Sequence, residues 1–402
     1  MKRVEELKSS YREIIQSKRQ DYENISDYIY NHPELGGEEF ESSKFLGEVL
    51  RQEGFDVKFP YETLPTAFVA EYGTGEYTVA TIAEYDALPG YGENGEPGHA
   101  CGHNWIAAAM CGLGISLSKI AKELNIKVRV YGTPAEETFG AKVDMIKLGA
   151  LEGVDLALQA HLDTASSVEA IALAMNSIEF TFKGKSAHAA AYPEKGINAL
   201  DGVIAMFNGI NAYREMTRDD ARIHGIITKG GEAANIIPEL CKCEISFRAR
   251  DSVYVAKLRK RIIEIAEGAA LISGTKLEYR DYENPFDDLI NLQSLGGIIK
   301  RNCQAVGIDN FLDTANYPGA GSTDMGNISH ACPTQYMEVE IGGGEVFAIH
   351  DEEAYRIANG EAAQNRLMDI IEGFGNSVIE IALDDELKQA IAKEHKDRIT
   401  IA

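Results

Sequence analysis

The sequence predicts an α/β protein in which one domain is interrupted by a smaller α+β module. Two observations support this division. Short apolar strands alternate with helices through about Ala174, as in an open α/β sheet, and the pattern then changes to alternating strands. Near Asn284-Pro285 the chain returns to helix-rich α/β sequence. We therefore expect a discontinuous domain of residues 1–174 and 286–402, and an inserted domain of residues 175–285.

The first part opens with helices and continues with three buried-type strands. The helical patterns run to about Tyr30 and over residues 38–53, where Gly54 ends the second. The strands are expected at residues 78–83, 127–131 and 155–160, and each leads to acidic or imidazole side chains. Open α/β sheets place their sites at the carboxyl ends of their strands, so these side chains are expected to meet there.

The inserted module reads as strand, helix, two strands, helix and strand. The strands are expected at about 177–182, 223–228, 241–248 and 275–279, with helices at about 196–214 and 253–270. This β-α-β-β-α-β order is that of the split-βαβ, ferredoxin-like arrangement. In the third strand, alternation places Cys241 and Cys243 on one face, where packing is favoured over a second metal site.

Five side chains of metal-ligand type occur in order along the first domain. Cys101 and His103 form a Cys-x-His step in a glycine-containing turn, and Glu137, His161 and His350 follow. A thiolate, imidazoles and a carboxylate suit a divalent transition metal, zinc above all, with manganese or cobalt as alternatives. Five such groups exceed what one tetrahedral ion needs, so the sequence suggests two ions.

Glu136, adjacent to Glu137, has the chemistry of a general base. Two neighbouring ions can lower the pKa of a water molecule and polarise a carbonyl, while a nearby carboxylate accepts the proton of that water. Two adjacent glutamates can divide the roles of base and ligand only if the backbone turns there. Pro134, two residues ahead of the pair, is consistent with such a turn.

The ordered motifs resemble one family of dimetal peptidases and amidohydrolases, which includes aminoacylase, carboxypeptidase G and indole-acetyl-amino-acid hydrolases. The similarity is greatest to the branch of p-aminobenzoyl-glutamate hydrolase and β-alanyl-lysine dipeptidase-like proteins, and it extends from about Asn31 to Glu353. The motifs that carry it are Glu-Tyr-Asp-Ala-Leu-Pro at 84–89, His-Ala-Cys-Gly-His-Asn at 99–104, Pro-Ala-Glu-Glu at 134–137, Ala-His at 160–161, Gly-Lys-x-Ala-His at 184–188, Gly-Glu-Ala-Ala-Asn-Ile-Ile-Pro at 231–238, Gly-Ser-Thr-Asp at 321–324 and Ile-His at 349–350.

The resemblance implies a zinc-exopeptidase-like catalytic domain with a mixed central sheet, and an inserted domain that acts as a lid and dimerises. It implies roles for residues already identified: metal ligands at Cys101, His103, Glu137, His161 and His350, and a general base at Glu136. Many relatives have His-x-Asp where this chain has Glu84-Tyr85-Asp86. Asp86 is therefore expected to support a ligand, and the division of ligands between the two ions stays open.

Residues of the inserted domain and of a late loop are further candidates. The resemblance implies that His188 reaches the partner subunit's active site to stabilise the oxyanion, and Asn235 is a similar candidate. Arg248 could bind a substrate carboxylate, although Arg250 or a plain surface salt bridge is an alternative. The loop Ser322, Thr323 and Asp324 could contact substrate, while Asp324 could instead cap a helix.

Each of these residues also has an ordinary structural interpretation. A buried cysteine is more often a small hydrophobic residue than a ligand, and a Glu-Glu pair is often a solvated helix start. His161 and His350, taken singly, could be satisfied core histidines. The ordered occurrence of all these groups favours the catalytic interpretation.

Composition restricts the protein's partners and location. The 402 residues carry a formal net charge of −24 without a basic cluster, which argues against nucleic acid as a partner. No apolar run approaches the roughly 20 residues that span a bilayer, and the N-terminus begins a charged helix, not a signal peptide. We expect a cytoplasmic homodimer or higher homo-oligomer whose partner is a small substrate.

Two classes of function are compatible with these residues. The first is metal-dependent hydrolysis of an amide or peptide bond in a small N-acyl amino acid or dipeptide. The second is a non-hydrolytic, metal-dependent binding or scaffold protein on the same fold, which the presence of Glu136 disfavours. Within the enzyme class, a broad aminoacylase or carboxypeptidase competes with a dipeptidase.

Overall fold

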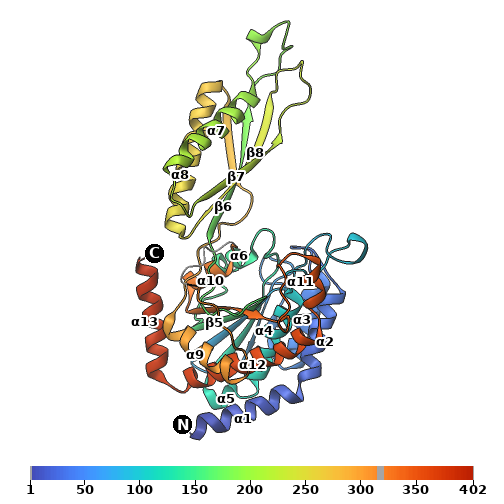
Figure 1. Ribbon diagram of the computed structural model, residues 1–402, viewed down its shortest axis with the longest axis vertical. Coiled ribbons are helices and arrows are strands. Elements are labelled where there is room, and N and C mark those ends of the chain that lie inside the picture. The colour runs from blue at the N-terminus through green and yellow to red at the C-terminus, as the bar shows by residue number, and fades with distance from the viewer. Residues whose placement is uncertain (1, 315–320, 402) are drawn as a thin grey trace. The chain divides into compact units, whose positions relative to one another are not determined.

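The computed structural model describes residues 2–314 and 321–401, which divide into two compact units (Figure 1). The first unit comprises residues 2–171, 289–314 and 324–401. The second comprises residues 172–288 and 321–323. The chain therefore leaves the first unit, builds the second and returns.

A six-stranded mixed sheet forms the centre of the first unit, in the order β1-β2-β4-β3-β5-β10. Strands β3, β4, β5 and β10 are parallel, and β1 and β2 are antiparallel additions at one edge. This confirms the mixed sheet predicted from sequence. The strands are β1 (Asp56–Lys58), β2 (Phe68–Tyr72), β3 (Tyr77–Ala83), β4 (Ile126–Gly132), β5 (Leu156–Asp163) and β10 (Thr334–Glu340).

Both faces of this sheet are covered, since the central strands β3 and β5 are buried at nearly every position. One face carries Val79, Val128 and Leu158 and packs in the main core, to which α2, α4, α9 and α12 contribute. The other carries Ala80 and Ile82 and packs in a smaller core with α6 and α10. The helices of the unit are α1 (Lys2–Ser17), α2 (Arg19–Asn31), α3 (Phe40–Gln52), α4 (His103–Ser118), α5 (Ala121–Leu124), α6 (Ala141–Lys147), α9 (Gln293–Ala305), α10 (Met325–Ala331), α11 (Glu352–Ile357), α12 (Glu361–Ala382) and α13 (Asp385–Ile401).

The second unit is a four-stranded antiparallel sheet in the order β7-β8-β6-β9, with two helices on one face (Figure 1). Its elements are β6 (Ala174–Lys183), α7 (Ala199–Tyr213), β7 (Arg222–Lys229), β8 (Leu240–Ala249), α8 (Ser252–Ser273) and β9 (Lys276–Asp281). This is the ferredoxin-like arrangement predicted from sequence. Along β8 every second residue is buried, which includes Cys241 and Cys243 in the core under the helices.

The predicted elements are found, with bounds that differ by a few residues: strands β4, β6 and β8 are longer than expected, whereas α3 and α7 are shorter. His161 lies inside β5, where the sequence placed it just after a strand, and β6 begins three residues earlier than expected. Among the described residues, no helix combines the length and apolar composition needed to cross a membrane.

Candidate metal centre and active site

The candidate ligands all lie at the carboxyl-terminal edge of the parallel strands. Asp86 follows β3, the Glu136–Glu137 pair follows β4, His161 is near the end of β5, and His350 follows β10. Cys101 and His103 are brought to the same edge by the turn that begins α4. Because parallel strands end at one edge of a sheet, side chains 249 positions apart in sequence, from 101 to 350, reach one place.

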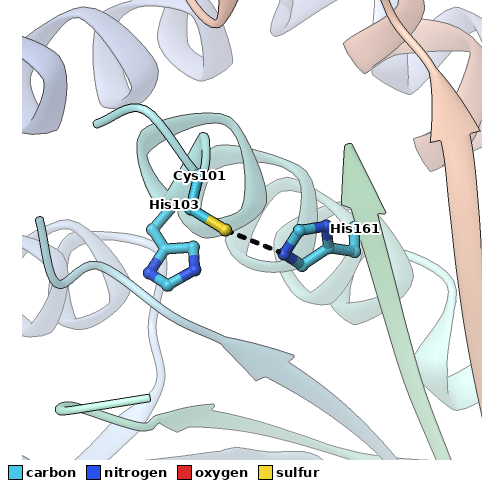
Figure 2. Close-up of side chains that lie close together, drawn as sticks. All are labelled: Cys101, His103 and His161. Carbon is cyan, nitrogen blue, oxygen red and sulfur yellow. Dashed lines mark hydrogen bonds between the residues drawn. The ribbon is translucent and has the colours of Figure 1, made fainter. Parts of the chain in front are cut away.

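Two groups of potential ligands share the thiol of Cys101. In one, the ligand atoms of Cys101, His103 and His161 lie within 4.8 Å of one another, and in the other those of Cys101, Glu137 and His350 do. Figure 2 shows the first group, with Cys101 Sγ at 3.5 Å from His161 Nε2. In the second, His350 Nε2 lies 3.2 Å from Glu137 Oε1. The structure thus brings together the five residues that the sequence nominated as ligands.

Two of the imidazoles are oriented by contacts through their other ring nitrogen. His103 Nδ1 lies 2.8 Å from Asp86 Oδ1, and His161 Nδ1 lies 2.8 Å from the carbonyl oxygen of Leu162. Both contacts leave Nε2 directed toward the cluster, as is usual for histidines that bind a metal. His103 Nε2 is buried without a hydrogen-bond partner among the described residues, while Glu137 Oε1 lies 3.8 Å away. This orphaned nitrogen and the soft and borderline donors around it fit a divalent transition metal.

Unusual backbone conformations hold the cluster in place. Gly102, which precedes α4, has φ +69°, and a Cβ there would lie 1.4 Å from Leu162 Cδ2, so only glycine fits. Ala135 and His350 have φ of 60° and 68°, a region that residues with a side chain rarely adopt. Such strain often occurs at functional sites, where the surrounding structure maintains it.

Glu136 lies next to a buried charged cluster that the sequence did not reveal. Its carboxylate belongs to one group with His103 and Glu137 and to another with Glu84 and Asp324, each within 4.8 Å. Lys142 Nζ lies 2.6 Å from Glu84 Oε1 and 2.6 Å from Asp324 Oδ1, and all three side chains are almost completely buried. Asp324 precedes α10 but does not cap it, because its carboxylate binds Lys142 instead.

Burial and neighbouring acids dominate the electrostatics of the site. Burial, together with the charges of Glu84, Glu137 and Asp324, raises the pKa of Glu136 well above its usual range. Burial and the charge of Glu137 likewise raise the pKa of the Cys101 thiol. A divalent cation among these groups would favour their deprotonated forms.

His188 and Asn235, the candidate oxyanion donors of the inserted domain, both lie in the second unit. His188 pairs with Ile236, and the N–H of Ala189 donates to the carbonyl oxygen of Asn235, so His188 and Asn235 lie on adjoining segments. His188 Nδ1 accepts from the N–H groups of Ala190 and Ala191, which leaves Nε2 as the donor nitrogen of the neutral ring. The side chains of His188 and Asn235 are exposed.

Arg248 and the late loop are partly buried. Arg248, on β8, has a buried Nε without a hydrogen-bond partner among the described residues, and burial lowers the pKa of its guanidinium. The hydroxyl of Ser322 is also buried without such a partner, and Thr323 is buried. Residues 315–320, which come before this loop, lie outside the described residues.

Sequence reasoning missed Lys142 and Glu39 and passed over Glu84. Lys142 lies in a short helix where lysine is ordinarily exposed, and Glu39 lies in an acidic run typical of a solvated helix start. Glu84 directly follows β3, two residues before Asp86, so its position alone could have identified it. Glu39 is fully buried, and burial together with the charge of Asp86 raises its pKa to about 7.

Comparisons with known proteins identify the relatives of this chain. Residues 174–272 match the model of the peptidase dimerisation domain. The chain is 31% identical over 390 residues to the Xaa-Arg dipeptidase of Mus musculus, covering 93% of this chain and 89% of that protein. It is 35% identical over 283 residues to one of the subunits of the p-aminobenzoyl-glutamate hydrolase of Escherichia coli K12, covering 67% of this chain and 59% of that bacterial chain.

A solved structure has the same fold. A dinuclear metal-binding peptidase of the M20 family from Bacillus subtilis aligns with a TM-score of 0.65 and 20% identity, covering 92% of this chain and 99% of that one. The two-unit architecture described above is thus the architecture of that peptidase.

Proposed function

The chain belongs to the M20 family of metallopeptidases, and we propose that it hydrolyses the amide bond of a small dipeptide or N-acyl amino acid. One observation carries the proposal: two groups of metal-ligand side chains share Cys101, and Glu136 lies beside them. This arrangement joins ligands for two ions to a carboxylate that can move a proton.

Cys101, His103, His161, Glu137 and His350 would hold two divalent ions, with Cys101 common to both sets. When bound, such ions supply Lewis-acid chemistry, which lowers the pKa of a water molecule and polarises the carbonyl that it attacks. The thiolate and imidazoles favour zinc, with manganese or cobalt as alternatives. Asp86 contributes by holding His103 through Nδ1 and the backbone of Glu137 through its N–H.

Glu136 would act as the general base. Its carboxylate is close to His103 and Glu137 but is not needed to complete either group that contains Cys101. It would take the proton from the attacking water and deliver it to the amine that leaves. His188 and Asn235 would donate hydrogen bonds to the developing oxyanion, since both present exposed polar groups on adjoining segments.

Arg248 would bind the substrate carboxylate. Its buried Nε without a hydrogen-bond partner among the described residues supports this role over a surface salt bridge, and Arg250 is the alternative. Ser322, Thr323 and Asp324 are further proposed substrate-binding residues. Of these, Asp324 also forms an ion pair with Lys142, inside the first unit. The dimerisation-domain match supports a homodimer, and six free cysteines support a reducing, cytoplasmic location.

The substrate class has two candidates. The name of the mouse relative favours a dipeptide, and the name of the Escherichia coli relative favours an N-acyl amino acid such as an aroyl-glutamate. We place the dipeptide first because the dipeptidase similarity covers most of both chains. A binding protein without turnover is the remaining alternative, and Glu136 argues against it.

Activity on a small panel tests the proposal. Purified protein supplied with zinc, manganese or cobalt should release free amino acid from dipeptides or N-acyl amino acids, and a chelator should abolish release. Elemental analysis of the protein should find about two ions per chain, and both Cys101→Ala and His161→Ala should lower that content. One ion or none after every metal is supplied would contradict the two-ion site, and bound metal without release would favour the binding protein.

A mixture of two inactive variants should regain activity if His188 acts in the partner subunit. His188→Ala lacks the oxyanion donor and Glu136→Gln lacks the base, but a heterodimer contains one site with both wild-type residues. With random exchange, half of the dimers are heterodimers and half of their sites are intact, so about one quarter of wild-type activity should return. Activity that stays at the level of the separate variants, with exchange demonstrated, would show that His188 does not act across subunits.

A further inference from the structure

Two buried carboxylates hold the backbone on either side of Glu136. Glu39 Oε1 accepts a hydrogen bond from the N–H of Ala135 at 2.7 Å, and Asp86 Oδ2 accepts one from the N–H of Glu137 at 2.9 Å. The peptide group between Pro134 and Ala135 and the one between Glu136 and Glu137 are therefore each fixed by a buried carboxylate. Asp86 also forms a hydrogen bond with His103 Nδ1. Glu39 contacts the site through its hydrogen bond with Ala135.

The turn at Ala135 needs such a contact. Ala135 has φ 60°, a left-handed conformation that is unfavourable for a residue with a Cβ. Its carbonyl oxygen already accepts from the N–H groups of Gly140 at 2.8 Å and Thr138 at 3.3 Å. Glu39 supplies the remaining backbone contact, on the N–H, and so completes the set that maintains this conformation. This left-handed residue directly precedes Glu136, so it sets the direction in which the backbone leaves β4 toward the proposed base.

The loop that carries Glu39 is itself fixed against the site. A Cβ on Gly36 would lie 2.6 Å from Thr138 Oγ1 and 3.2 Å from Ala135 Cα, so this loop packs directly on the turn. The N–H of Ala87 donates to the carbonyl oxygen of Glu34 at 2.8 Å, which ties the same loop to the segment after β3. The position of the Glu39 carboxylate is therefore set by both segments that bear site residues.

Packing alone does not account for Glu39. Its side chain is 0% exposed, yet its Oε2 has no hydrogen-bond partner among the described residues. A buried carboxylate with an unsatisfied oxygen is destabilising relative to an apolar side chain of similar size. The other oxygen of Glu39, Oε1, accepts the hydrogen bond from Ala135, which an apolar side chain could not do. This contact explains a carboxylate at position 39.

We propose that Glu39 is a positioning residue of the active site: as acceptor for the Ala135 N–H, it maintains the left-handed turn that directs Glu136 toward the reacting water. This inference rests on the proposed function, in which Glu136 is the general base. The hydrogen bond carries the role and the negative charge does not, so a glutamine, whose amide oxygen can accept the same bond, should replace Glu39.

Glu39→Met and Glu39→Gln test the proposal in the full chain. Glu39→Met removes the acceptor and should lower kcat by about 10- to 100-fold, the usual consequence of a small displacement of a catalytic group. Its KM and metal content should stay close to those of the wild type, because Asp86 still holds Glu137. Glu39→Gln should retain most of the wild-type kcat. Hydrogen exchange of a peptide covering residues 133–139 should be faster in Glu39→Met and unchanged in Glu39→Gln.

Glu34→Met is the matched control. The Glu34 side chain lies on the same loop and accepts from the N–H groups of Glu41 and Ser42 at the start of α3, away from the turn. It should lower thermal stability without changing kcat or exchange at residues 133–139. Equal losses of kcat in both Glu39 variants, with unchanged exchange in that peptide, would overturn the proposal. If the wild type itself does not hydrolyse the panel, the proposed function fails, while the exchange experiment still decides whether Glu39 holds the turn.

Discussion

Glu136→Gln should retain the wild-type metal content and lower kcat by about two to four orders of magnitude, the range for loss of a general acid–base group. The amide keeps the size of the carboxylate but cannot accept the proton of the attacking water. Metal content is expected to persist because the two ligand groups that contain Cys101 do not include Glu136. Kinetics with a saturating substrate and elemental analysis of the same sample measure the two quantities.

Glu137→Gln is the control for that experiment. Glu137 lies 3.2 Å from His350 Nε2 and belongs to the same group as Cys101, so its loss should reduce metal content as well as kcat. Glu136→Gln and Glu137→Gln would then both have a low kcat, but only Glu137→Gln would lose metal. Equal loss of metal in both variants would contradict the division into base and ligand.

The sequence predicted the convergence of the ligands because they follow a simple geometric rule. Asp86, Glu137 and His161 stand at the ends of three apolar strands, and parallel strands end at one edge of the sheet. Pro134 indicated the turn before the glutamate pair. The ferredoxin-like module was predictable for a similar reason, since its alternating strands and intervening helices have distinct periods.

The supporting contacts could not be predicted because they depend on tertiary structure alone. Lys142 and Asp324 are separated by 182 positions and meet only when α6 and α10 pack side by side on one face of the sheet. Glu39 and Ala135 are 96 positions apart, and nothing in an alanine suggests a left-handed backbone. A lysine in a helix and a glutamate in an acidic run are ordinarily exposed, so the sequence alone does not distinguish either from a surface residue.

Lys142→Met should destabilise the protein by about 3–5 kcal/mol, the cost of removing one partner from a buried ion pair. The Lys142 side chain is 0% exposed and contacts two carboxylates, Glu84 and Asp324, at 2.6 Å each. Burial alone would lower the pKa of Lys142, but the charges of Asp324 and Glu84 outweigh it and raise that pKa, so the ammonium is charged. Without it, Glu84, Asp324 and Glu136 would face one another as buried acids within 4.8 Å.

Urea unfolding measured by the fluorescence of Trp105 tests this prediction. Trp105 is the one tryptophan of the chain and is buried in α4, so it reports on the unit that contains Lys142. Lys147→Met, on the same helix, is the matched control: its pair with Asp144 is exposed, and its loss should change the free energy of unfolding by less than about 1 kcal/mol.

Lys142→Met combined with Asp324→Asn should lose less than the sum of the single changes, because the second substitution removes one of the carboxylates left unpaired by the first. A loss for Lys142→Met no larger than that of Lys147→Met would mean that the ammonium does not stabilise the buried pair of Glu84 and Asp324.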